Sequence, residues 1–255
     1  MKKIRVRFQT AIRLFKNCLF RPLKSARFIK QWHRFNKTAG NQWPVLARDV
    51  YPILNEACCS AGLARGHYFL QDVWAAQEVF GARPGRHVDV GSRVDGFVAH
   101  VASFLKLEYV DLRPLDTALP NLQAVEGSIL NLPYPDRSLN SVSSLHVLEH
   151  IGLGRYGDEL DADGWQKGLK ELARVLKPGG MLLLSVPVGK QRVCFNAHRI
   201  FHPKTIIEYC TDLKLIKYWL IPSDSSRGWE EDPGFEKSQQ ADYGCGLFKF
   251  EKTGG

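Results

Sequence analysis

The sequence predicts an α/β fold built on a mostly parallel sheet. From residue 86 onward, short apolar runs typical of strands alternate with helical or loop segments. A glycine turn follows the first of these runs, HVDV, as at the start of a β-α-β unit. With 255 residues, 44% of them hydrophobic, the chain can bury one sizeable core. We therefore expect one large domain with an appendage.

Each element of that fold has its own signal. Glycine and proline mark the ends of the apolar runs, and Lys177-Pro178-Gly179-Gly180 ends the helix before the fifth run. His202-Pro203 opens a late helix. The expected helices span Phe97–Leu105 and Trp165–Leu176, and the expected strands span 86–91, 107–113, 122–129, 139–147, 181–189, 213–222 and 246–252.

The first 85 residues differ in character from the rest. Residues 1–48 contain thirteen Lys or Arg and no acid, which leaves 22 basic and 26 acidic residues beyond them. Ile4, Phe8, Ile12, Phe15 and Leu19 fall on one helical face among basic residues. We expect three parts: a basic amphipathic segment over 1–44, a helical cap over 45–85 and the main domain over 86–255.

The role of the basic segment has more than one interpretation. Basic helices with aromatic residues favour anionic lipid surfaces, so residues 1–38 predict attachment to a membrane face. Alternatively, the apolar stripe packs on the main domain, or the segment is an organelle presequence. The acidic balance of the main domain argues against a broad nucleic-acid footprint there.

Localisation follows from what the sequence lacks. It has no apolar run of about 18 residues and no secretory signal pattern. Its six cysteines show no C-x-x-C spacing, which favours reduced thiols and argues against a structural zinc site. We expect a cytoplasmic protein, peripheral at the inner membrane face.

The glycine turn, HVDVGSRVDGF, predicts a ligand site. Backbone amides at such a turn face ligands at the carboxyl edge of the sheet, although Arg93 stands where a dinucleotide fingerprint has its second glycine. Asp111 ends the second strand twenty residues after Gly91, where a carboxylate accepts hydrogen bonds from ribose hydroxyls. Together they predict a nucleoside-containing cofactor.

The order of these pieces from Arg86 to Lys252 resembles the class I S-adenosylmethionine-dependent methyltransferases. The resemblance rests on VDVGS, Asp111, EGSI at 126–129, LNSVSSLHVLEHI and ELARVLKPGGMLLLSVP. It implies a Rossmann-like, mostly parallel seven-stranded sheet with an antiparallel last strand, preceded by N-terminal helices, and S-adenosylmethionine as cofactor. The cofactor-binding residues that it implies are Asp89, Gly91, Ser92, Gly96, Asp111, Ser128, Ile129 and His146.

Two departures from the family pattern matter for that cofactor. Arg93 replaces a glycine in the first motif, and Ser128 stands where the superfamily often has an acid. Narrower segments, including HVLEHIGLGRYGD and FNAHRIF, look like a little-characterised bacterial methyltransferase-like group met among polysaccharide-assembly genes.

Two histidines are the catalytic candidates. His150 follows the fourth strand and His198 follows the fifth, where this fold presents residues to the acceptor. HVLEH also matches an inverted zinc-protease pattern, but glycines follow within a turn and a third ligand is missing. GLGRYG at 152–157 is interpreted as a loop beside the site. No metal ligands are assigned; whether Glu149, His150, Asp161 and Asp163 converge is left open.

These observations predict an enzyme. The leading hypothesis is methyl transfer from S-adenosylmethionine to a hydroxyl of a glycan, glycan precursor or other small acceptor, with a histidine taking the proton. The alternative is a non-catalytic, membrane-associated partner in polysaccharide assembly. A weaker third reading is nucleic-acid methylation guided by the basic arm. The acceptor atom and the oligomeric state are left open.

Overall fold

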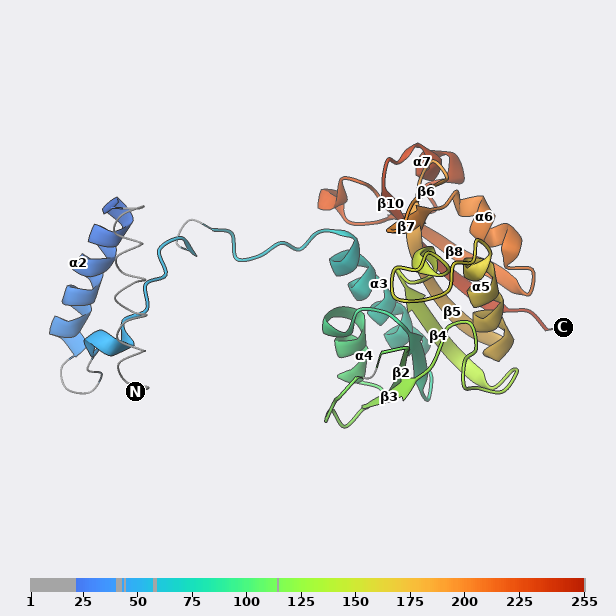
Figure 1. Ribbon diagram of the computed structural model, residues 1–255, viewed down its shortest axis with the longest axis horizontal. Helices are drawn as coiled ribbons and strands as arrows, with labels where there is room; N and C mark the ends of the chain where they lie inside the picture. Colours follow the sequence, from blue (N-terminus) through green and yellow to red (C-terminus); the bar gives the residue numbers. More distant parts are fainter. Residues whose placement is uncertain (1–21, 40–42, 44, 57–58, 114, 255) are drawn as a thin grey trace. The chain divides into compact units, whose positions relative to one another are not determined.

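An eight-stranded sheet organises the main unit, in the order β3-β2-β1-β4-β5-β10-β8-β9 (Figure 1). The pairs β3–β2, β2–β1, β1–β4 and β4–β5 are parallel. β10, the last strand in the chain, lies antiparallel between β5 and β8. The predicted mostly parallel sheet with an antiparallel last strand is confirmed. The two-residue strand β9 adds an eighth strand, antiparallel to β8, at the edge.

The computed structural model describes residues 22–39, 43, 45–56, 59–113 and 115–254. Two features lack a strong sequence signal: the short hairpin β6–β7 and the edge strand β9. The strands are β1 (His87–Val90), β2 (Leu107–Asp111), β3 (Leu122–Glu126), β4 (Leu139–Leu145), β5 (Leu176–Val188), β6 (Arg192–Cys194), β7 (His198–Ile200), β8 (Leu213–Ile221), β9 (Glu230–Glu231) and β10 (Gly244–Lys252). The helices are α2 (Pro22–Ala39), η1 (Ala47–Asp49), α3 (His67–Ala82), η3 (Val94–Val98), α4 (Ala99–Ala102), η4 (Leu148–His150), α5 (Gly164–Val175), α6 (Pro203–Tyr209), η5 (Ser225–Arg227) and α7 (Phe235–Gln240).

Two apolar layers cover the two faces of the sheet. Successive side chains of a strand point to opposite faces, so β5 contributes Leu182 and Leu184 to one layer and Leu183 to the other. α5 and α6 pack on the first face, and α3 and α4 pack on the second (Figure 1). The site therefore sits on a sheet that is covered on both sides.

Helix α3 belongs to the main unit. Trp74 meets Trp219 of β8 edge-on at a centroid distance of 5.3 Å, and the Lys249 ammonium pairs with Glu78 at 2.7 Å. Residues 64–255 form one compact unit and residues 1–63 another. The boundary between units thus falls before α3 and not at residue 86.

In the described part of the predicted helical cap over 45–85, the two complete helices are η1 and α3. Residues 50–54 are not helical, contrary to the expected periodicity of Val50, Ile53 and Leu54. Pro52 lacks an amide donor, and Gly62 and Gly66 lower helix propensity before α3, which explains why one continuous helix does not form.

The N-terminal unit carries the basic helix α2. Within it, Leu23, Ile29 and Phe35 are exposed beside five Lys or Arg residues and no acid. The predicted apolar face over residues 4–19 lies outside the described residues. None of the helices in the described ranges combines the length and apolar character that crossing a lipid bilayer requires.

Buried polar residues link β1 to β4 beneath the sheet rim. His87 is fully buried; its Nδ1 lies 2.7 Å from the Ser141 hydroxyl and its Nε2 lies 2.8 Å from the Ser143 hydroxyl. Ser143 also donates to the Asp89 carboxylate at 2.5 Å. The Ser143 hydroxyl has one proton, which it donates to Asp89, so it accepts a hydrogen bond from Nε2–H of His87. Nδ1 of His87 therefore carries no proton and accepts from the Ser141 hydroxyl.

We expect the folding stability to depend on pH through His87. Burial lowers its pKa from 6.5 to about 3, so its contribution is present above pH 6.5 and is lost as the pH falls toward 3. In His87→Gln this dependence is missing. The stability difference between wild type and variant should shrink by about 1.4 kcal/mol between about pH 7.5 and about pH 5.5, measured by urea unfolding. A difference that stays constant with pH contradicts the assignment.

Candidate functional site

The site lies at the carboxyl ends of β1, β2 and β4. In the register of β1 and β2, Val90 is paired with Val110, which brings Gly91 beside Asp111. The Gly91 amide donates to the Val110 carbonyl at 2.9 Å. Both residues line one cavity, which is partly open to solvent.

The turn after β1 requires glycine at position 91. Gly91 has a φ of +75°, and a Cβ there would lie 3.2 Å from both methyl groups of Val147 across the cavity. Glycine therefore permits the close approach of Val147 to this turn, and both residues line the cavity.

Asp89 and Ser92 hold that turn from below. The Asp89 carboxylate accepts from the Ser92 amide at 3.0 Å and from the Ser92 hydroxyl at 2.6 Å. The Leu145 amide donates to the Ser92 hydroxyl at 3.0 Å, which joins the turn to β4. Burial raises the pKa of Asp89 to about 7, partly offset by these hydrogen bonds. Asp89 and Ser92 were predicted to bind the cofactor. In the structure both are buried behind the turn and do not line the cavity.

Arg93 is not among the residues that line the cavity. Its guanidinium pairs with Asp95 at 2.6 Å and lies 5.1 Å from the centre of the Tyr68 ring. The departure from the glycine motif at this position therefore leaves the cavity open.

Gly96, also predicted to contact the cofactor, packs against α3 instead. A Cβ at Gly96 would lie 1.9 Å from Oδ2 of Asp72. The glycine permits the first turn of the following helix to approach α3, which is a packing role. Burial raises the pKa of the facing Asp72 to about 6.

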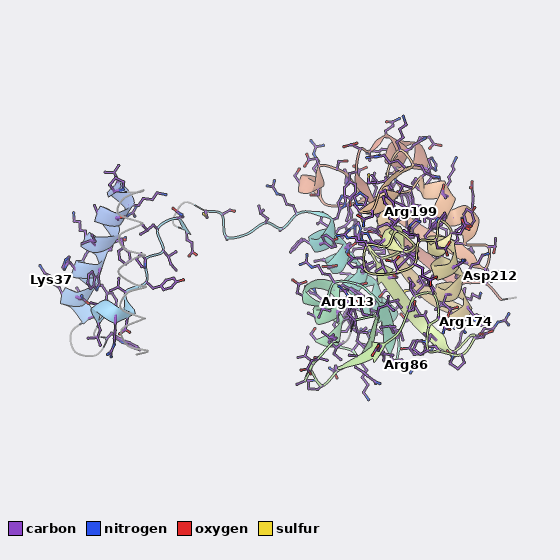
Figure 2. The ribbon with its side chains drawn as sticks, viewed as in Figure 1. Lys37, Arg86, Arg113, Arg174, Arg199 and Asp212 are labelled. Atoms are coloured by element: carbon purple, nitrogen blue, oxygen red, sulfur yellow. The ribbon has the colours of Figure 1, made fainter. Side chains whose placement is uncertain are left out.

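The carboxylate of Asp111 is already fully engaged. It accepts from the Arg113 amide at 2.9 Å, from Nε and Nη2 of Arg113 at 2.9 and 2.8 Å, and from the Tyr109 hydroxyl at 2.8 Å. Burial raises its pKa, but these hydrogen bonds outweigh burial and hold the pKa below its usual value. Arg113, which is labelled in Figure 2, was not predicted from the sequence as a site residue. The pattern that could have identified it is the Asp-x-Arg spacing at the end of a strand.

The loop after β3 contributes one predicted residue to the cavity. Ile129 and Gly127 line it, whereas the Ser128 hydroxyl accepts from the Leu130 amide at 3.1 Å and is not among the lining residues. Ser128 therefore shapes the loop, and the apolar Ile129 forms the wall.

His146 lies where β4 ends. Its φ of +55° is unusual for a residue with a Cβ, and its amide donates to Ser185 at the carbonyl. Nδ1 lies 2.6 Å from the Glu149 carboxylate, and the ring lines the cavity wall. Burial lowers the pKa of His146, but the adjacent Cys245 and Glu149 outweigh burial and raise it well above its usual value.

His150 and His198 separate in the structure. Nδ1 of His150 lies 2.7 Å from the Ala197 carbonyl, which can only accept, so Nδ1 carries the proton and Nε2 keeps its lone pair. His150 lines the cavity, whereas His198 does not; its ring lies 5.3 Å from that of Tyr243, and burial lowers its pKa. Of the two, His150 has the position and the tautomer of a general base.

Tyr156, from the GLGRYG loop, completes the wall. Its ring contacts His150 edge-on at 5.6 Å and lies 5.4 Å from the Arg113 guanidinium and 5.2 Å from that of Arg155. The loop predicted to lie beside the site therefore contributes to the cavity and places two cations at its mouth.

Several known proteins are similar to this chain. Residues 118–216 match the model of a family described as Caenorhabditis protein of unknown function, DUF268. A demethylmenaquinone methyltransferase of Staphylococcus epidermidis is 41% identical over 66 residues, which is 26% of this chain and 23% of the relative. That of Chlorobaculum tepidum is 26% identical over 140 residues, 52% of this chain and 53% of the relative. The chain thus spans about half or less of these curated relatives.

Solved structures establish the fold. The cyclase SpnF superposes with a TM-score of 0.52 at 16% identity, over 72% of this chain and 81% of that one. The 1,6-didemethyltoxoflavin-N1-methyltransferase of Burkholderia thailandensis, solved with S-adenosylhomocysteine, gives a TM-score of 0.51 at 14% identity, over 72% and 79% of the two chains. The main unit therefore has the Rossmann-like fold of class I S-adenosylmethionine-dependent methyltransferases.

Proposed function

We propose that this chain is a methyltransferase that uses S-adenosylmethionine. One observation carries the proposal: Gly91 and Asp111 stand side by side on the rim of one cavity in a sheet of this fold. Ligands of such sheets bind at the carboxyl ends of the strands, with the glycine turn and the acid at the nucleoside. The methyltransferases among the similar proteins agree with this assignment.

The residues present fit the cofactor at three points. The backbone at Gly91 would hold its amino-acid part, Asp111 would accept hydrogen bonds from the ribose, and Ile129 would pack against the adenine. When bound, the cofactor supplies an electrophilic methyl group. This chain's own residues align the acceptor with that methyl and exclude water.

The acceptor that we propose is a hydroxyl of a glycan or glycan precursor. A sugar hydroxyl is a poor nucleophile at neutral pH, so a base must remove its proton. Nε2 of His150, on the cavity wall, is the candidate base. Arg155 and Tyr156 at the mouth suit a polar or anionic acceptor. The choice of a glycan is supported by the sequence resemblance to the polysaccharide-associated group.

A second function is favoured by a specific observation. All four hydrogen-bonding positions of the Asp111 carboxylate are occupied by Arg113 and Tyr109. If Arg113 is not displaced, the ribose has no acceptor, and the chain acts as a non-catalytic partner in polysaccharide assembly. The two functions differ in whether the cofactor binds.

The third part of the proposal is attachment to an anionic membrane surface through α2 and the preceding basic residues. The exposed apolar side chains of α2 stand among five cations without an acid. Such helices lie in the lipid interface, with each basic residue contributing about 1 kcal/mol near an anionic surface.

Cofactor binding is tested with Asp111→Asn and Arg113→Ala by calorimetric titration with S-adenosylhomocysteine. Asp111→Asn should weaken binding at least about tenfold, because hydrogen bonds to a charged group contribute about 1.5–3 kcal/mol. Arg113→Ala should tighten it up to about fivefold, since an ion pair this exposed opposes binding by at most about 1 kcal/mol. The exposed Asp116→Asn is the matched control.

The outcomes separate the two functions. Wild-type binding that is unaffected by Asp111→Asn refutes the proposed ribose contact. If the wild type gives no heat and Arg113→Ala does, the ion pair blocks the cofactor and the non-catalytic function is favoured.

The acceptor and the base are tested with methyl-labelled S-adenosylmethionine and a set of glycan acceptors. Label should appear as a methyl ether, which resists the alkaline hydrolysis that cleaves esters. His150→Gln should lower the rate by about 10²–10⁴-fold while S-adenosylhomocysteine still binds. His198→Ala, outside the cavity, is the matched control and should retain activity. Equal loss in both variants contradicts the assignment of His150.

Membrane attachment is tested by sedimentation with vesicles that contain phosphatidylserine. The triple variant Arg27→Gln, Lys30→Gln, Arg34→Gln should bind on the order of a hundredfold more weakly, because about 3 kcal/mol of attraction is lost. The same change at Lys106, Lys177 and Lys190 of the main unit is the control. Retention of the α2 variant equal to that of the control argues against a lipid surface.

A further inference from the structure

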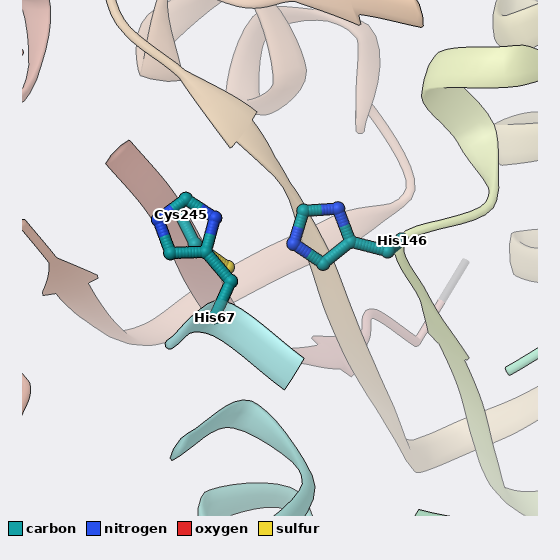
Figure 3. A group of neighbouring side chains, drawn as sticks. All are labelled: His67, His146 and Cys245. Atoms are coloured by element: carbon teal, nitrogen blue, oxygen red, sulfur yellow. The ribbon is translucent and has the colours of Figure 1, made fainter. Parts of the chain in front are cut away.

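Three side chains from distant parts of the sequence converge beside the cavity. His67 is the first residue of α3, His146 follows β4, and Cys245 lies in β10. One ligand atom from each lies within 4.8 Å of the other two. Figure 3 shows the three side chains as neighbours. Two imidazole nitrogens and one sulfur form a ligand set that zinc prefers.

His146 is oriented as a metal ligand. Its Nδ1 is bound to the Glu149 carboxylate at 2.6 Å. Its Nε2, on the other side of the ring, is fully buried and has no hydrogen-bond partner among the described residues. Metal-binding histidines characteristically give their second nitrogen to a carboxylate, which fixes the ring. An ion at Nε2 of His146 would take the place of the proton there.

The charges of the cluster also favour a cation. Glu149 is 1% exposed, and its Oε2 has no partner in the described part of the chain. A buried carboxylate without full compensation is costly. A divalent ion bound at Nε2 of His146 would place a positive charge near this carboxylate.

The distances require a small adjustment. A tetrahedral zinc ion, with bonds of about 2.0–2.3 Å, holds its ligand atoms about 3.5 Å apart. Because the three atoms lie within 4.8 Å of one another, they must close by up to about 1.3 Å. His67 is only partly buried and its ring is held mainly by stacking on Tyr243 at 5.1 Å, which permits that movement.

We propose that His67, His146 and Cys245 bind a zinc ion, with Glu149 as the positioning residue of His146. Three protein ligands leave a fourth position for water or an acceptor oxygen, as in catalytic zinc sites. A hydroxyl bound there loses its proton more easily. That consequence rests on the proposed methyl transfer; the metal site itself does not.

The experiment uses the full chain, stripped of metal with a chelator and titrated with cobalt(II) and then zinc. Wild type should bind one ion, with a thiolate-to-cobalt charge-transfer band and the visible bands of tetrahedral cobalt, which zinc then abolishes. Zinc should also raise the melting temperature, because it binds the folded state. Neither methyl donor nor acceptor is present, so a failure of the proposed methyl transfer does not affect the result.

Variants localise the ion. Cys245→Ala should lose the charge-transfer band, and His67→Ala, at a partly buried position that tolerates truncation, should lose the tetrahedral bands. Glu149→Gln should weaken zinc about ten- to a hundredfold. The matched controls, His198→Ala and Cys194→Ala, should bind as wild type. The proposal is overturned if wild type binds no stoichiometric ion, or if folded His67→Ala keeps the wild-type spectrum.

Discussion

The site depends on the buried hydrogen bonds that fix the turn between β1 and η3. Asp89 holds the amide and the hydroxyl of Ser92, and Ser143 connects the same carboxylate to β4. A carboxylate in the interior is retained only when its oxygens are satisfied, and here they are. The network therefore makes the position of Gly91 a property of the sheet. A ligand that binds at Gly91 meets a preorganised backbone, and little ordering entropy opposes it.

At the end of the neighbouring strand β2, in contrast, the hydrogen bonds of Asp111 can be exchanged. Two of the four acceptor positions of Asp111 are filled by the Arg113 guanidinium, and the Arg113 side chain is 68% exposed. An exposed ion pair adds little stability, so a ligand with two hydroxyls can exchange with it at small cost. The released Arg113 guanidinium would remain near Tyr156, which it already contacts. The rim thus combines a rigid turn with an exchangeable carboxylate.

The sequence predicts the fold better than the site, for physical reasons. The main strands follow from apolar runs that are bounded by glycine and proline, and their order in the chain predicts a parallel sheet. Gly91, Asp111, Ile129, His146 and His150, which the sequence predicts as site residues, line one cavity, because strand ends converge at one edge. Asp89, Ser92, Gly96 and Ser128 share the same motifs but support the backbone instead. Motif spacing does not reveal which face of a turn a side chain occupies.

His67 and Cys245 show the limit of spacing arguments most clearly. They are separated by most of the main unit in sequence, and neither belongs to a local motif, so only the packing of α3 on β8 and β10 brings them together. The same packing places their cluster behind His146, whose ring also lines the cavity. His146 thus belongs to both the cluster and the cavity wall, and Glu149 fixes its orientation. Any group that moves His146 at the cluster must alter the cavity wall, which couples the two without a separate conformational change.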